Sequence, residues 1–122
     1  MKVAELFSCP KPTGTSCDWG EEVDLSVWDA ACVHEAGVLK AWYWYVCGGY
    51  EGTGYMLCLT DSGRWGVHYM GHCSCCGPTE DVWDSLRTTH ESLEALEEYC
   101  ATDQLRHEIS ALIEAARASQ KN

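Results

Sequence analysis

The sequence has no long hydrophobic run, few basic residues and almost no asparagine. Its longest apolar stretch, residues 41–47, is far shorter than the roughly 20 residues that a membrane-spanning helix needs. Only 8 lysines and arginines stand against 19 acidic residues, which gives a net charge of −11. Because nucleic-acid affinity depends on basic side chains that displace counterions, this balance disfavours direct binding to DNA or RNA. Asn122 is the only asparagine, so the sequence contains no N-glycosylation sequon.

The N-terminal segment also lacks the apolar stretch of a secretory signal, because residues 1–7 combine one lysine with an early glutamate. We therefore expect a reducing, cytoplasmic environment. The chain carries nine cysteines, an odd number that excludes complete internal pairing. In a reducing compartment, closely spaced cysteines are more often metal ligands or buried thiols than disulfides.

The length and composition predict one domain over residues 1–122, with 46% hydrophobic and 22% charged residues. Residues 1–22 are predicted to form an irregular arm that contains cysteines, because residues 9–17 hold two of the three prolines. Ser26 and Asp29 have the spacing of a capping box, which favours a helix over about residues 27–36 that ends at Gly37. The alternative is a short strand, indicated by three alternating apolar residues, Val23, Leu25 and Val27.

Residues 39–70 are predicted to form a three-stranded antiparallel meander, with Gly63 in a hairpin turn. On the second and third strands, alternation places two apolar sets on one buried face: Tyr55, Leu57 and Leu59, and Trp65, Val67 and Tyr69. The first strand has tryptophans on one side, Trp42 and Trp44, and tyrosines on the other, Tyr43 and Tyr45. One aromatic face is expected under the helices. The second aromatic face, on the other side of the strand, is predicted to be core and to be closed with the help of Trp19, Trp28 and Trp83. The alternative is that this second face is a binding surface.

Two C-terminal helices over residues 88–119 are predicted to pack on this sheet, because a three-stranded meander does not form a core alone. Thr88 and Glu91 form a capping box for the first helix, which we expect to reach about Cys100. Thr102 or Asp103 caps the second helix, whose apolar residues share one face: Leu105, Ile109, Leu112, Ile113 and Ala116. The predicted fold class is therefore α+β.

The loop over residues 71–78 concentrates the residues with metal-binding chemistry. Cys73 and Cys76 have the spacing with which two thiolates reach one tetrahedral zinc ion, and His72 and Cys75 lie beside them. One such knuckle does not complete a site. Additional ligands are expected from the arm or the sheet, with Cys9, Cys17 and His68 as candidates and Cys47 or Cys58 as further possibilities. We expect a structural zinc ion, because thiolates are soft ligands that favour zinc.

The hairpin and this loop together resemble small, largely uncharacterised bacteriophage-encoded proteins in which a strand-turn-strand precedes His-Cys-Ser-Cys-Tyr-Gly. The similarity covers about residues 40–84 and rests on residues 50–55, 61–65 and 71–78. Cys76 stands where that family usually has tyrosine, so the resemblance makes His72, Cys73 and Cys75 the common element. It implies a phage origin, an accessory role and the host-cell cytoplasm as the location.

Acidic residues gather at helical spacing near the C-terminal third, where like-charge pairs each cost roughly 0.2 to 0.5 kcal/mol. Only Arg87 opposes them within the segment over residues 80–98. Four of these side chains are predicted to contact a basic partner: Glu91, Glu94, Glu97 and Glu98.

These patterns predict a small acidic phage-type accessory protein that binds a host or phage protein, with the Cys/His cluster as a structural metal site. Under this interpretation no residue has a catalytic role. The alternative is a thiol- or metal-dependent enzyme that uses His72, Cys73 and Cys75, because thiols beside imidazoles can form a nucleophile and its base. A minor virion component is a further alternative.

Overall fold

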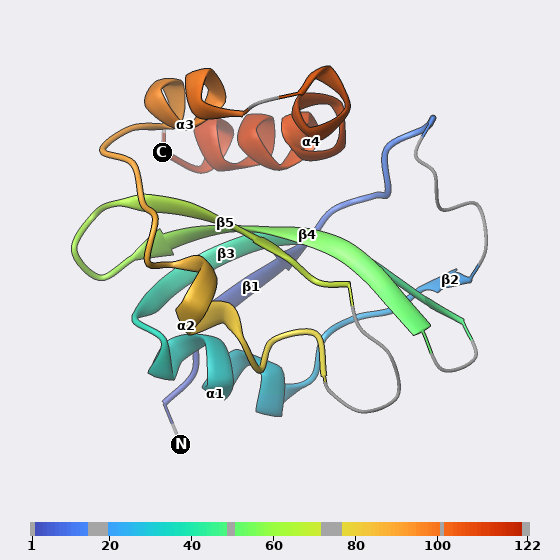
Figure 1. The fold of residues 1–122 in the computed structure, drawn as a ribbon. Coiled ribbons are helices and arrows are strands. Elements are labelled where there is room, and N and C mark those ends of the chain that lie inside the picture. Colours follow the sequence, from blue (N-terminus) through green and yellow to red (C-terminus); the bar gives the residue numbers. More distant parts are fainter. Residues whose placement is uncertain (1, 15–19, 49–50, 72–76, 101, 121–122) are drawn as a thin grey trace.

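The computed structural model describes residues 2–14, 20–48, 51–71, 77–100 and 102–120. Its elements follow the order β1 (Glu5–Ser8), β2 (Glu21–Glu22), α1 (Val27–Glu35), β3 (Val38–Gly48), β4 (Glu51–Thr60), β5 (Trp65–Tyr69), α2 (Val82–Ser85), α3 (Leu93–Tyr99) and α4 (Asp103–Gln120). A curved sheet separates α3 and α4 on one face from α1 and α2 on the other (Figure 1). The predicted α+β class is confirmed. No described helix is long and apolar enough to cross a membrane.

The sheet is larger than the predicted three-stranded meander. The strands β3, β4 and β5 are antiparallel neighbours, but the other edge of β3 is also occupied. There β1 runs parallel to β3, with Glu5 opposite Lys40, and β2 runs antiparallel to it, with Glu22 opposite Val46. The arm is therefore not wholly irregular, because it supplies two strands. Their pairing satisfies N–H and C=O groups that an unpaired edge of the long strand β3 would expose.

The helix predicted over residues 27–36 is present as α1. The Ser26 hydroxyl accepts a hydrogen bond from the Asp29 N–H at 3.2 Å, and the Asp29 carboxylate accepts one from the Ser26 N–H at 2.9 Å. This reciprocal pair is the predicted capping box, and it decides against the strand alternative for this segment. Gly37 follows the helix with φ +95°, a backbone conformation that glycine adopts without steric cost.

The first C-terminal helix begins later than the Thr88 capping box predicts. Ser92 caps α3, accepting a hydrogen bond from the Ala95 N–H at 3.1 Å. Before this cap, His90 is bridged to β5, because it exchanges backbone hydrogen bonds with Trp65 at 2.7 and 2.8 Å. A tertiary contact thus prevents the local capping signal from acting. In α4 the Thr102 hydroxyl accepts from the Leu105 N–H, as one of the two predicted caps would.

Both faces of the sheet are core, as strand alternation predicts. The face under α3 and α4 buries the two strand tryptophans with residues from β4, β5 and both helices: Trp42, Trp44, Leu57, Trp65, Leu93, Leu96, Ile109, Leu112, Ile113 and Ala116. The face under α1 and α2 buries the two strand tyrosines, Tyr43 and Tyr45, together with other residues of the sheet and helices: Val33, Val38, Ala41, Met56, Cys58, Met70 and Val82. The second aromatic face is therefore covered by helices and is not left open as a binding surface.

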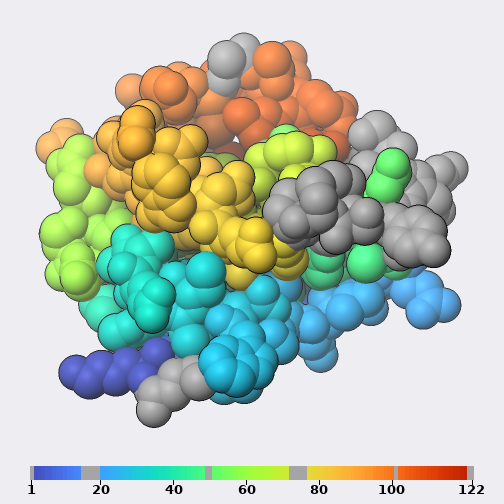
Figure 2. All heavy atoms as spheres, turned by 60° about the horizontal axis from the view of Figure 1, so that its bottom comes forward, coloured from blue at the N-terminus to red at the C-terminus, as the bar shows by residue number. Residues whose placement is uncertain are grey.

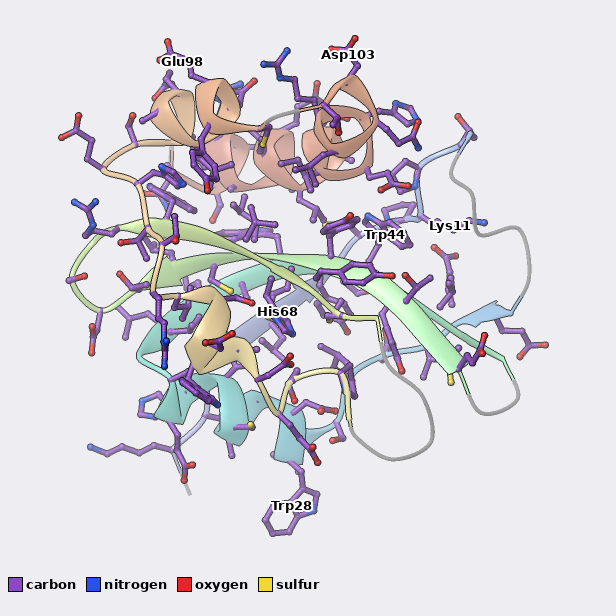
Figure 3. All side chains as sticks on the ribbon, viewed as in Figure 1. Lys11, Trp28, Trp44, His68, Glu98 and Asp103 are labelled. Carbon is purple, nitrogen blue, oxygen red and sulfur yellow. The ribbon has the colours of Figure 1, made fainter. Side chains whose placement is uncertain are left out.

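The expectation that Trp28 and Trp83 help to close this second core is wrong. Trp28 is 71% exposed and Trp83 is 56% exposed. Figure 3 shows the Trp28 ring pointing away from the molecule, whereas Trp44 lies between the sheet and α4. The core face of α1 is instead occupied by Ala30 and Val33, which leaves Trp28 on the outer side of the helix. Trp19 lies outside the described residues.

Candidate functional site

The predicted zinc loop and one of its possible extra ligands lie outside the described residues: His72, Cys73, Cys75, Cys76 and Cys17. Their role as ligands therefore stays a prediction. Cys9 is described and follows β1, where it is half-buried and its thiol faces the Phe7 carbonyl. Within the described ranges, no three His, Cys, Asp or Glu side chains are grouped so that they can hold a metal ion.

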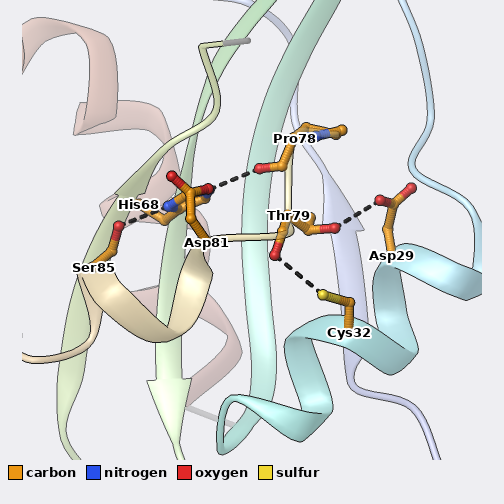
Figure 4. Close-up of polar contacts among 7 residues, drawn as sticks. All are labelled: Asp29, Cys32, His68, Pro78, Thr79, Asp81 and Ser85. Atoms are coloured by element: carbon orange, nitrogen blue, oxygen red, sulfur yellow. Dashed lines mark hydrogen bonds and ion pairs between the residues drawn. The ribbon is translucent and has the colours of Figure 1, made fainter. Parts of the chain in front are cut away.

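His68, the other proposed extra ligand, is buried on β5 at 1% exposure. Its Nδ1 lies 2.7 Å from the Ser85 Oγ, and its Nε2 lies 2.7 Å from the Pro78 carbonyl oxygen (Figure 4). A carbonyl oxygen only accepts hydrogen bonds, so in the neutral imidazole Nε2 carries the proton and Nδ1 accepts from the Ser85 hydroxyl. In this arrangement neither ring nitrogen offers a free lone pair to a metal ion.

Asp81 adds a negative charge on the Nε2 side of the same imidazole. Its Oδ1 is 3.6 Å from His68 Nε2, which is beyond hydrogen-bond distance. The carboxylate is 74% exposed, so water screens its attraction for a positive imidazolium. The segment from Pro78 to Ser85 thus surrounds His68 with an acceptor, a hydroxyl and a carboxylate.

A second set of polar contacts ties α1 to the segment that leads into α2. The Thr79 hydroxyl donates to the Asp29 carboxylate at 2.7 Å, and the Cys32 thiol donates to the Thr79 carbonyl at 3.2 Å (Figure 4). Asp29 is the same residue that caps α1, so one carboxylate serves both contacts. These bonds hold α1 and the residues before α2 together on one face of the molecule.

Burial makes the thiols of this face and of the core poor nucleophiles. Cys58 is fully buried, and desolvation raises its pKa to about 12. Desolvation also raises the pKa of Cys32, and the nearby carboxylates of Glu35 and Asp29 raise it further. The pKa values of Cys9 and Cys100 are raised by burial as well. The reactive thiolate of the enzyme alternative is thus not favoured at these four cysteines, and its predicted residues lie outside the described chain.

The predicted acidic surface on α3 is partly neutralised by a residue far along the sequence. Arg117 of α4 forms ion pairs with Glu94 and Glu97, so Arg87 is not the one cation that opposes this patch. Glu91 and Glu98 are exposed, and Figure 3 shows Glu98 on the outer side of α3. Their contact with a partner stays a prediction.

A groove with a cavity volume of about 290 Å³ lies between α1 and the segment around α2, which are side by side in Figure 2. Its lining combines an exposed indole, two carboxylates and smaller groups: Trp83, Glu35, Glu80, Cys32, Ala36 and Thr79. Trp28 precedes Cys32 by one helical turn on α1, and its exposed indole lies outside the lining of the groove. We call Trp28, Glu35, Glu80 and Trp83 the indole-carboxylate surface. Sequence reasoning missed it because both tryptophans were assigned to the core.

A separate cavity of about 350 Å³ lies on the opposite face of the sheet, beside β5 and below α3 and α4. Aromatic and aliphatic side chains dominate its lining, together with three polar residues from the edge of the sheet, Ser85, Thr88 and His90. Two aromatic pairs flank it: Tyr55 with Tyr69 at 5.2 Å and His90 with Tyr99 at 4.6 Å between ring centroids. Sequence spacing gave no signal for this cavity, because Tyr69 and Tyr99 come to line one space only in the tertiary structure.

Comparisons of the chain with protein-family models, with curated protein sequences and with solved structures found no match. The resemblance to phage-encoded proteins therefore stays an expectation, and a function is inferred from the sites themselves.

Proposed function

We propose that this chain is a small acidic accessory protein of phage type that binds a basic segment of a partner protein. The observation that carries this proposal is the indole-carboxylate surface. Large exposed apolar side chains beside charged ones are a feature of interaction sites rather than of ordinary surface. The two charged residues in the groove lining, Glu35 and Glu80, are both carboxylates, which complement a basic partner.

The contacts of Trp83 indicate which basic side chain suits this surface. The Arg87 guanidinium lies over the Trp83 ring at 5.2 Å from its centroid, and its Nε is 3.2 Å from the Asp84 carboxylate. An indole and a carboxylate therefore already hold a guanidinium together within this chain. Arginine stacks on aromatic rings more readily than lysine because its charge is planar and weakly hydrated. A partner arginine on Trp28 or on the groove side of Trp83 would meet the same chemistry.

The acidic patch on α3 is a second candidate contact for the same partner. Its carboxylates at Glu94 and Glu97 are paired with Arg117, which reduces their attraction for an external cation. We therefore place the main contact on the indole-carboxylate surface and assign the α3 patch to electrostatic steering of the approach.

Binding of a defined basic peptide tests this function. A fluorescently labelled peptide of alternating arginine and glycine should bind the wild-type chain, and the double variant W28A/W83A should bind it about tenfold more weakly, because two cation–π contacts of about 0.5 to 1 kcal/mol each are lost. The matched control is E94Q/E97Q/E98Q, which should change the affinity less. Fluorescence anisotropy at two salt concentrations measures both.

Each contrary outcome has a distinct meaning. A larger loss in the α3 variant than in W28A/W83A would move the docking site to the acidic helix and reject the indole-carboxylate surface. No binding of either the arginine peptide or an equivalent lysine peptide by the wild-type chain would reject the proposed function.

A structural zinc ion held by His72, Cys73, Cys75 and Cys76 is the second part of the proposal, supported by their residue types and spacing. Protein purified without a histidine tag should contain about one zinc per chain, and chelation should lower its melting temperature, because binding energy at a structural site is folding energy. Cys73→Ser should lose the metal, whereas the control Cys32→Ser should retain it. Metal-free protein with an unchanged melting curve would contradict the site and favour the reactive-cysteine alternative.

A further inference from the structure

Ser85 has the surroundings of a nucleophile. Its hydroxyl donates to the Nδ1 of a buried histidine at 2.7 Å, and that histidine is itself fixed by the Pro78 carbonyl at 2.7 Å. A nucleophile within hydrogen-bond distance of a base, with the base oriented by a third group, is the general arrangement of activated serines. Asp81 lies 3.6 Å from the far nitrogen, where its exposed carboxylate adds a water-screened attraction for the imidazolium that forms when His68 takes a proton.

The position of Ser85 connects this pair to a cavity. Ser85 ends α2 and is one of the residues that line the cavity of about 350 Å³ beside β5. The hydroxyl that is hydrogen-bonded to His68 therefore belongs to a residue at the wall of a partly open cavity rather than to one deep in the core. The volume lies at the lower end of the range for small-molecule sites.

The lining of the cavity defines the class of substrate. The described residues that line it include no Lys, Arg, Asp or Glu, and most are tyrosine, leucine or valine. Such a wall suits an uncharged, apolar or aryl group and disfavours phosphates and carboxylates. Cys100 also borders the cavity, and burial raises the pKa of its thiol, whereas Ser85 has the His68 imidazole within hydrogen-bond distance as a base.

We propose that Ser85 and His68 form a nucleophile–base pair that hydrolyses uncharged esters whose acyl group enters the cavity beside β5. This activity is independent of the docking function proposed above. Its cavity lies on the α3 and α4 side of the sheet, whereas the indole-carboxylate surface lies on the α1 and α2 side. Ser85 and Trp83 share the short helix α2, and the activity requires no metal.

Hydrolysis proceeds through an acyl-serine intermediate. Ser85 Oγ bonds to the acyl carbon while its proton passes to His68 Nδ1, and the carbon–oxygen bond to the alcohol then breaks as Nδ1 returns the proton to the leaving oxygen. Water next bonds to the acyl carbon of the acyl-serine and gives its proton to Nδ1. The bond to Ser85 Oγ breaks, and the hydroxyl recovers that proton. The products are the carboxylic acid and the alcohol, and no oxidant or cofactor enters.

The decisive experiment combines covalent labelling with turnover. An alkyl fluorophosphonate should label the folded wild-type chain once, and peptide mass spectrometry should place the label on Ser85. Wild-type protein should turn over p-nitrophenyl butyrate, and Ser85→Ala should reduce multiple-turnover hydrolysis at least about 100-fold. Ser85→Ala retains all nine thiols, so direct acylation of cysteine does not account for the difference.

Ser110→Ala is the matched control, since Ser110 is exposed on α4 and its hydroxyl donates to the His107 backbone carbonyl rather than to a histidine ring nitrogen. It should leave labelling and turnover unchanged. A folded wild-type chain that takes no label at Ser85, or equal turnover by wild type and Ser85→Ala, would overturn the proposal. Labelling of the wild type decides the question even if Ser85→Ala does not fold.

Discussion

Replacing Trp44 by alanine should lower the free energy of unfolding by about 3 to 5 kcal/mol, the usual cost of removing a large aromatic side chain from a core. Trp44 is 1% exposed and packs beside Tyr55 with ring centroids 6.0 Å apart. Its indole N–H also donates to the Glu108 carbonyl at 2.7 Å, which links β3 to α4. The variant therefore loses both apolar contact and the hydrogen bond that joins the sheet to the C-terminal helix.

Urea denaturation of two comparison variants separates these contributions. Trp44→Phe keeps part of the ring volume and loses the hydrogen bond, so it should cost less than Trp44→Ala. Trp28→Ala removes the same side chain from the exposed side of α1 and should change stability by no more than about 0.5 kcal/mol. Equal losses at positions 28 and 44 would contradict the assignment of one tryptophan to the core and the other to the surface.

Stability should also fall steeply in alkaline solution, and Cys58 should account for a defined share of that fall. Burial raises the pKa of Cys58 from 9.0 to about 12. Below pH 9 the thiol is protonated in both states and contributes no pH dependence. Between pH 9 and about 12 the unfolded chain loses this proton while the folded chain keeps it, so rising pH favours unfolding by about 1.4 kcal/mol per pH unit.

The measurement is urea denaturation in reducing buffer at pH 8, 9, 10 and 10.5, on the wild type and on Cys58→Val. Valine is apolar and suits the buried strand position, so the variant should be folded and should show a shallower loss above pH 9. Raised pKa values at Tyr45, Cys9, Cys32 and Cys100 act in the same direction and leave a residual slope in the variant. Identical slopes in the two proteins would show that Cys58 is not held in a desolvated site.

Local signals predicted the parts of the fold that depend on nearby residues. The Ser26 capping box places α1, because both partners lie within one turn. The turn before β5 is where glycine predicts it, with Gly63 at φ +81°. Strand alternation also separated the tryptophan face of β3 from its tyrosine face, since side-chain direction along a strand follows directly from sequence parity.

The remaining features depend on contacts between distant residues. The strand β1 pairs with β3 from 35 residues away, with Glu5 opposite Lys40, and no local pattern marks a parallel edge strand of four residues. The start of α3 is set by the bridge between His90 and Trp65 rather than by Thr88. Ion pairing of Arg117 with Glu94 and Glu97 likewise joins two helices.

The candidate sites also divide into those marked by local sequence signals and those formed by contacts between distant residues. The spacing of cysteines in the zinc loop is a local signal, and it made that loop the first candidate. The Ser85–His68 pair joins residues 17 apart on different elements, and nothing in their spacing marks it. The indole-carboxylate surface was missed for another reason: hydrophobicity assigns tryptophan to a core by default, and only the packing of α1 and α2 shows which indoles are exposed.

The most direct test of the proposed function is to observe the tryptophan indoles while a basic peptide binds. The chain has six tryptophans, so a ¹⁵N-labelled sample gives six indole N–H signals, which single Trp→Phe variants assign. Addition of the arginine–glycine peptide should shift the signals of Trp28 and Trp83 and leave that of buried Trp44 unchanged. Shifts at Trp28 and Trp83 no larger than the shift at Trp44 would contradict docking on the indole-carboxylate surface.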